Sequence, residues 1–168
     1  MEVEVKIRGL MLDPNTNQPI VVLQDLAGDR VIPIWIGGAE AQAIAFELEK
    51  HVPPRPQTHD LMRNLVIGLN ASLCKIVVTE LKDDSFYAVL WFDRQGQIIS
   101  LDSRPSDAFA LALRLDCPMY VDESVLKSSS ISSQDPEGDS QDREIRSPGA
   151  DARISPETIS GPKTRDSA

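Results

Sequence analysis

Residues 102–107 carry the densest group of polar side chains in this chain. They place two carboxylates, one guanidinium and two hydroxyls around a proline, directly before an apolar helical pattern. A guanidinium suits phosphate because its planar fork meets two phosphate oxygens at once, and carboxylates bind hard divalent cations. We therefore predict a site in which Asp102 and Asp107 bind a metal ion or orient water, while Arg104 holds a phosphate.

The same run has a second, purely structural interpretation. Pro105 fits the first position of a helix, where its missing N–H is not needed, and Asp107 in the first turn complements the helix dipole. Ser106 would then help to start the helix, and Arg104 would pair with Asp102. The sequence leaves both interpretations open.

A second polar junction, residues 53–60, also leads from a proline-rich loop into a helix. His59 is a candidate general acid or base because the histidine ring ordinarily titrates near neutral pH. Asp60 follows it, about a hundred degrees around the helix, so the two side chains would face a shared cleft from different sides. Glu40 stands in the first turn of an earlier predicted helix. Alternatively, both carboxylates serve only the helix dipoles and His59 is an ordinary surface residue.

Basic side chains gather around this proline loop. The candidate phosphate contacts are Lys50, Arg55, Arg63 and Ser106. A solvated surface would explain the three basic residues equally well. Oxygen ligands favour hard cations, so Mg²⁺ or Mn²⁺ is the metal we expect. The candidate metal ligands are Glu40, Asp60, Asp102 and Asp107.

The composition limits the classes of function. The 168 residues carry 17 basic and 26 acidic side chains, for a net charge of -9. This charge disfavours contact with nucleic acid unless a local basic patch or bridging cations take part. Cys74 and Cys117 are distant in sequence and lie among apolar residues, as is typical of reduced core cysteines. With no hydrophobic signal region and no apolar run near about 18 residues, we expect a cytoplasmic protein without a membrane partner.

The elements that must position these residues indicate an α+β fold with a mixed or antiparallel sheet and about three helices. Strands are expected over residues 3–7, 20–23, 31–36, 73–81, 86–92, 97–101 and 118–121. Helices are expected over residues 39–50, from residue 58 onward, and after residues 102–107, with one further helical turn at 122–126. The second helix is indicated by the spacing of Leu61, Leu65 and Leu69.

A change of composition near Lys127 divides the chain. The 41 residues of 128–168 include 10 Ser, 4 Pro and 3 Gly, and their few large apolar residues are isolated. Such a segment cannot bury enough surface to offset the entropy of ordering it. We expect a folded domain over residues 1–127 and a disordered, acidic tail, rich in Ser, Pro and Gly, over residues 128–168.

Several blocks of residues also carry a family resemblance. They are residues 32–37, 40–45, 54–61, 86–88, 102–108 and 118–121. In this order they resemble the blocks of the bifunctional nuclease (BFN) domain family, over residues 1–127. The resemblance implies a compact α+β domain, often oligomeric, that cleaves both DNA and RNA. This chain departs from the pattern at Asp84-Ser85, where Gly-Thr is more usual, and at Phe109, where a smaller aliphatic residue is usual.

Together these observations predict a nuclease that hydrolyses phosphodiester bonds in DNA and RNA with little sequence preference and depends on Mg²⁺ or Mn²⁺. Arg104, helped by Arg55, would bind the scissile phosphate, and His59 would shuttle a proton. The predicted catalytic residues are His59, Asp60, Asp102, Arg104 and Asp107. One alternative is a non-catalytic binding or regulatory domain that recognises a small anionic ligand or a protein partner. Another is a homo-oligomer in which the polar blocks form salt bridges between subunits.

Overall fold

A mixed sheet runs through the part of the chain that the computed structural model describes, residues 1–129 and 131–132. Its strands are β1 (Glu2–Leu12), β2 (Pro19–Asp25), β3 (Arg30–Trp35), β4 (Ser72–Lys82), β5 (Ser85–Arg94), β6 (Gln97–Ser103), β7 (Met119–Asp122) and β8 (Ile131–Ser132). They lie in the order β6-β5-β4-β7-β1-β2-β3-β8. The paired strands are antiparallel except for β4 and β7, which run parallel. The predicted α+β class with a mixed sheet is confirmed.

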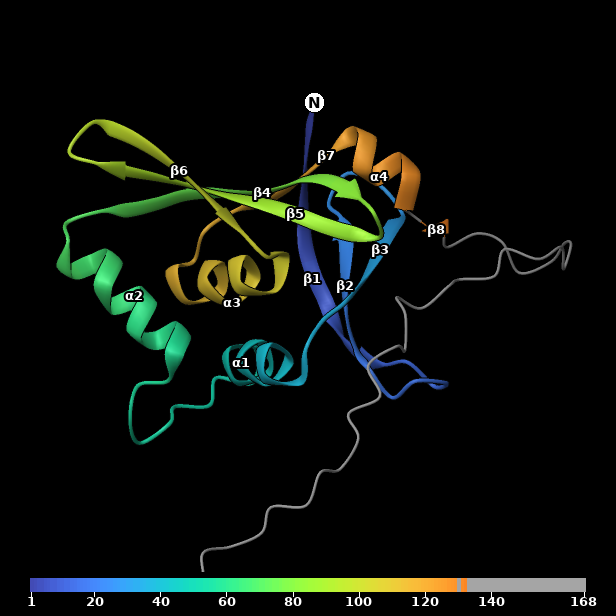
Figure 1. The fold of residues 1–168 in the computed structure, drawn as a ribbon, viewed down its shortest axis with the longest axis horizontal. Coiled ribbons are helices and arrows are strands. Elements are labelled where there is room, and N and C mark those ends of the chain that lie inside the picture. Colours follow the sequence, from blue (N-terminus) through green and yellow to red (C-terminus); the bar gives the residue numbers. More distant parts are fainter. Residues whose placement is uncertain (130, 133–168) are drawn as a thin grey trace, which may run out of the picture. The chain divides into compact units, whose positions relative to one another are not determined.

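Helices α1 (Gly38–Leu48), α2 (Thr58–Gly68), α3 (Pro105–Leu115) and α4 (Glu123–Ser129) complete the described part. Helix α3 connects β6 to β7 and packs on β4 and β5, while α1 and α2 both pack on α3 (Figure 1). The expected single turn after β7 is a seven-residue helix, α4, so the described residues form four helices rather than about three. The N-terminal ends of α1, α2 and α3 carry six of the predicted polar residues, Glu40, His59, Asp60, Arg104, Ser106 and Asp107.

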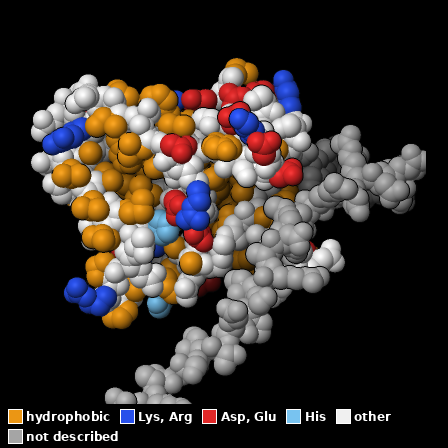
Figure 2. All heavy atoms as spheres, viewed as in Figure 1, with side chains coloured by type: hydrophobic (Ala, Val, Ile, Leu, Met, Phe, Trp, Pro, Cys, Tyr) orange, Lys and Arg blue, Asp and Glu red, His pale blue; other side chains and the backbone are white. Residues whose placement is uncertain are grey.

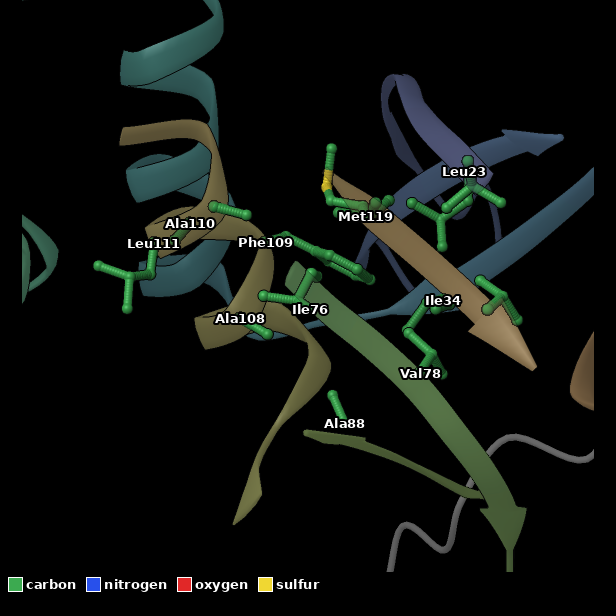
Figure 3. Packing of buried hydrophobic residues seen from close by; sticks show 14 of the residues in the cluster. Leu23, Ile34, Ile76, Val78, Ala88, Ala108, Phe109, Ala110, Leu111 and Met119 are labelled. Atoms are coloured by element: carbon green, nitrogen blue, oxygen red, sulfur yellow. The ribbon is translucent and has the colours of Figure 1, made fainter. Parts of the chain in front are cut away.

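The buried core lies between α3 and the sheet. Seven of the eleven residues of α3 are buried, because its small alanines let the helix approach the strands closely. Phe109 is 0% exposed and belongs to the same buried cluster as Ile76 and Val78 of β4 and Ile34 of β3 (Figure 3). The first turn of α3 is therefore held rigidly against the sheet.

Helix α2 forms where predicted, but the face that it buries is not the one that carries the three leucines. Leu61, Leu65 and Leu69 are 56%, 54% and 58% exposed. The opposite face packs inward, with His59 buried and Met62 and Val66 partly buried against the core. The polar side chains at the start of α2 favour this orientation, because His59 is hydrogen bonded to Asp107 and Asp60 forms a salt bridge with Arg114, both on α3.

The described structure continues past the predicted boundary at residue 127. Helix α4 ends at Ser129, and β8 pairs with β3. Residue 130 and residues 133–168, which make up most of the predicted tail, lie outside the described residues. Among the helices of the described part, none is both long enough and apolar enough to span a membrane.

Candidate functional site

The site begins at the junction between β6 and α3, where one residue separates strand from helix. Arg104 is the N-cap of α3, with an extended backbone, and Pro105 occupies the first helical turn as predicted. This geometry places the Arg104 side chain beside the residue three positions further on. Arg104 Nε donates a hydrogen bond to Asp107 Oδ2 at 2.8 Å.

The other oxygen of Asp107 faces α2. Nε2 of His59 lies 2.9 Å from Asp107 Oδ1, and the two side chains are 9% and 24% exposed. An ionised carboxylate only accepts hydrogen bonds, so it selects the ring form that carries a proton on Nε2. In that form the lone pair of the neutral ring is on Nδ1.

Nδ1 of His59 is the ring atom that remains to accept a proton. Within the part of the chain that the structure describes, this atom has no hydrogen-bond partner. No unpartnered polar side-chain atom in that part is fully buried, so Nδ1 is not completely enclosed. A largely buried ring with one nitrogen fixed by a carboxylate and the other not completely enclosed is suited to accept a proton.

Glu40, in the first turn of α1, joins the same group of side chains. Arg104 Nη2 donates to Glu40 Oε1 at 2.7 Å, so one guanidinium spans carboxylates from α1 and α3. The hydrogen bond from Arg104 to Glu40, and to a smaller extent the one to Asp107, raise the pKa of the guanidinium above its ordinary value. Although both contacts hold it, the Arg104 side chain remains 66% exposed.

A glycine makes room for this contact. A Cβ atom added at Gly37 would lie 2.3 Å from Oε2 of Glu40, which is too close for both to remain in place. Gly37 has a φ of -73°, a conformation open to any residue. Glycine at this position therefore lets the Glu40 carboxylate keep its present place, and a larger residue would displace the end of the Glu40 side chain.

We call Glu40, His59, Arg104 and Asp107 the His59 network. All four were predicted as site residues, and the structure brings them together from α1, α2 and the start of α3. Figure 2 shows acidic, basic and histidine side chains gathered at one place on this face, surrounded by hydrophobic side chains. The arrangement combines a proton acceptor with an exposed guanidinium.

Asp60 contacts a residue outside the His59 network. Its Oδ1 accepts a 2.7 Å hydrogen bond from Nε of Arg114, and its Oδ2 accepts one of 2.9 Å from the backbone N–H of Gln57. Burial raises the pKa of Asp60, but the hydrogen bonds from Arg114 and Gln57 and the charges of Arg114 and Arg63 outweigh it. The pKa is therefore lowered below its usual 3.8.

Sequence reasoning missed Arg114, although a signal was present. Arg114 follows Asp107 by seven residues, about two helical turns, so both lie on the face of α3 that meets α2. His59 and Asp60, which are adjacent on α2, contact these two residues respectively.

The remaining predicted residues stand apart from the His59 network. Asp102 is exposed on β6 opposite Val89, and Arg104 bonds to Glu40 and Asp107 rather than to Asp102. Ser106 is buried in the first turn of α3. The three basic candidates, Lys50, Arg55 and Arg63, are exposed around the end of α1 and the start of α2. Lys50 forms a salt bridge with Glu47.

The predicted metal ligands do not form one site in this arrangement. Among the described residues, no group of three or more His, Cys, Asp or Glu side chains is placed to hold a metal ion. Arg104 occupies the space between Glu40 and Asp107, and Asp60 faces Arg114. The dependence on Mg²⁺ or Mn²⁺ stays a prediction.

Comparison with known proteins gives relatives for the part of the chain that holds the site. Residues 21–134 match the family model described as the bifunctional nuclease domain. The chain is 44% identical over 128 residues to an uncharacterized protein of Mycobacterium tuberculosis strain H37Rv, and the match covers 76% of each chain. It is 24% identical over 116 residues to Bifunctional nuclease 1 of Oryza sativa subsp. japonica, which covers 67% of this chain and 35% of the plant protein.

Proposed function

This chain belongs to the bifunctional nuclease domain family, and on that premise we propose that it hydrolyses phosphodiester bonds in DNA and RNA with little sequence preference. The observation that carries the proposal is the pairing of His59 with Asp107 beside the exposed guanidinium of Arg104. A base that activates water and a phosphate-binding cation each promote hydrolysis of a phosphodiester, and the predicted Mg²⁺ or Mn²⁺ would act in addition to them.

In the proposed reaction, His59 acts as the general base. Nδ1 accepts a proton from a water molecule as the water oxygen attacks phosphorus, and the bond to the leaving oxygen breaks. Water is the nucleophile because DNA has no 2′-hydroxyl, so one mechanism serves both substrates. Asp107 holds the ring in the required form and stabilises the positive charge that the ring gains. The ring then gives its proton to the leaving oxygen or to solvent.

Arg104 would contact the scissile phosphate. Its exposed edge presents N–H donors in a fixed direction because Glu40 and Asp107 hold the rest of the guanidinium. Donors oriented in advance stabilise the charge that builds up on the phosphate oxygens. Arg55 and Arg63, exposed near the start of α2, would contact neighbouring phosphates, with Lys50 as a further proposed contact. Ser106 is buried, so its proposed contact would require a local rearrangement.

The acidic surroundings of Arg104 support the predicted need for cations. The chain has a net charge of -9, and two carboxylates flank the one guanidinium of the His59 network. Cations that lower the repulsion between protein and nucleic acid would favour binding. We predict that chelation of Mg²⁺ or Mn²⁺ abolishes cleavage.

A non-catalytic anion-binding domain is the second candidate function. The observation that favours it is the fixed and exposed Arg104 guanidinium, which is a receptor for a small anion even without turnover. The salt bridges of Arg104 form within one chain, so they do not require a second subunit.

Self-association is a separate part of the proposal. Leu61, Leu65 and Leu69 leave one face of α2 apolar and exposed, and surfaces of this kind commonly bind protein. We propose that this face joins copies in a homo-oligomer, which light scattering after size-exclusion chromatography would measure.

A cytoplasmic location stays a prediction, supported by Cys74 and Cys117, which are both free thiols.

The experiment that tests the proposal compares cleavage of labelled single-stranded DNA and RNA by wild type and Arg104→Gln. Arg30→Gln is the matched control, because Arg30 also bridges two carboxylates, those of Asp25 and Glu123, outside the site. If one site cleaves both substrates, the rates on DNA and RNA should fall together in Arg104→Gln and remain unchanged in Arg30→Gln. Absence of turnover on both substrates, with and without Mn²⁺, would favour the anion-binding domain.

A further inference from the structure

The largely buried guanidinium of Arg114 contacts residues of three helices next to the His59 network. The Arg114 side chain is 4% exposed. Its Nη1 donates to the backbone oxygens of Ala43 in α1 at 3.1 Å and Ala110 in α3 at 2.9 Å. Its Nε donates to Asp60 in α2 at 2.7 Å. The three contacts fix the positions of α1, α2 and α3 relative to one another.

Through Asp60, the contacts of Arg114 also fix the position of the neighbouring residue His59. It immediately follows His59, and its second oxygen binds the backbone N–H of Gln57 at the start of α2. The first turn of α2 is therefore fixed on both sides of His59. A shift of that turn would carry the His59 ring away from Asp107.

The rest of α2 provides little to hold this turn in place. Leu61, Leu65 and Leu69 face away from α3, and the inward face contributes only partly buried side chains from Met62 and Val66. Apolar packing is non-directional and sets no precise register. Among the described residues, the directional contacts between α2 and α3 are the hydrogen bond of His59 with Asp107 and the salt bridge of Asp60 with Arg114.

We infer that Arg114 is a positioning residue, which acts through Asp60 to hold His59 against Asp107. Its catalytic consequence rests on the proposed function, whereas its effect on the His59 ring does not. Lysine cannot reproduce these contacts, because its three N–H donors all lie on one nitrogen atom. Arg114 uses two separate nitrogens of a planar guanidinium, Nε for the Asp60 carboxylate and Nη1 for the two carbonyl oxygens.

The test uses ¹⁵N NMR of the histidine rings at one fixed pH in wild type, Arg114→Lys and Asp60→Asn. The chain has two histidines, so a His51→Gln variant assigns both signals. Ring ¹⁵N shifts report which nitrogen carries the proton and whether it is hydrogen bonded. We expect both variants to lose the wild-type His59 pattern and approach that of exposed His51. Arg30→Lys, which weakens an ion-pair network elsewhere, should leave the His59 pattern unchanged.

Kinetics provide the second readout. Misplacement of His59 should lower kcat about tenfold to a hundredfold while KM changes less than about threefold. An unchanged His59 pattern in both variants, or an equal change in Arg30→Lys, would overturn the inference. If wild type cleaves nothing, the proposed function fails while the NMR comparison still decides the role of Arg114. If Arg114→Lys does not fold, Asp60→Asn decides it, because that variant leaves both carbonyl contacts of Arg114 in place.

Discussion

His59 and Asp107 are 48 residues apart in the sequence, yet Nε2 of one lies 2.9 Å from Oδ1 of the other. The contact joins the first turn of α2 to the first turn of α3, next to the Arg104 guanidinium. It therefore favours the observed orientation of α2 and determines which ring nitrogen of His59 remains to accept a proton. A single pair of atoms links the packing of the helices to the proposed chemistry.

Asp107→Asn should impair cleavage strongly. Both oxygens of Asp107 accept hydrogen bonds, from His59 and from Arg104, and an amide offers only one oxygen. One donor must therefore face an NH₂ group, which changes the ring form of His59 or releases Arg104. We expect kcat to fall about 10²- to 10⁴-fold, measured by single-turnover cleavage. A wild-type rate in a correctly folded variant would remove Asp107 from the mechanism.

Gly37→Ala should displace Glu40 without unfolding the protein. The added methyl group competes with Oε2 of Glu40 for the same space, while the backbone at Gly37 accepts alanine. Arg104 would lose one of its two anchors, so KM for DNA should rise roughly tenfold, the effect of about 1.4 kcal/mol. Gly38→Ala is the control, because a Cβ there meets no atom within 4 Å. Equal KM values for the two variants would contradict a role for Glu40 in holding Arg104.

Asp60 should contribute to stability above its ordinary pKa of 3.8 and lose that contribution in acid. Its pKa is lowered in the folded protein, so between the two values the unfolded state binds more protons and stability rises with pH. The difference in free energy of unfolding between wild type and Asp60→Asn should therefore be constant above about pH 5 and shrink as pH falls through 3.8. Urea titrations at several pH values measure it, and a difference that grows in acid would contradict the assignment.

Phe109→Ala should be among the most destabilising single changes in the described core. The side chain is 0% exposed between α3 and the sheet, so its removal leaves a cavity. We expect a loss of about 3–5 kcal/mol in the free energy of unfolding, measured by chemical denaturation. Val52→Ala, at a residue that is 86% exposed, should change it by less than about 0.5 kcal/mol. A small effect at Phe109 would mean that the core relaxes to fill the space.

The sequence was sufficient to locate the members of the His59 network one by one. Glu40, His59 and Asp107 each stand in or near the first turn of a helix that follows glycine or proline, and such turns are readable locally. The contacts among these residues could not be predicted from the sequence. The structural interpretation of residues 102–107 pairs Arg104 with Asp102, but Arg104 bonds to Glu40, 64 residues away, because α1 packs on α3. Packing between distant helices leaves no local pattern.

The orientation of α2 could not be predicted for a related reason. The spacing of Leu61, Leu65 and Leu69 indicates a helix, and the usual expectation is that such a stripe is buried. In the structure the leucines face outward, while His59 is hydrogen bonded to Asp107 and Asp60 forms a salt bridge with Arg114 on the opposite side of α2. The partner of Asp60, Arg114, appears in the sequence as an ordinary basic residue in the last turn of a helix.

The most direct test of the central claim is the initial rate at which His59→Gln cleaves labelled single-stranded DNA, compared with His51→Gln. His51 is exposed and its ring contacts Phe46, so its variant controls for the loss of a histidine outside the site. At matched folding, measured by circular dichroism, we predict that His59→Gln loses about 10²-fold or more of the wild-type rate and that His51→Gln retains it. Equal rates for the two variants would contradict a His59–Asp107 catalytic pair.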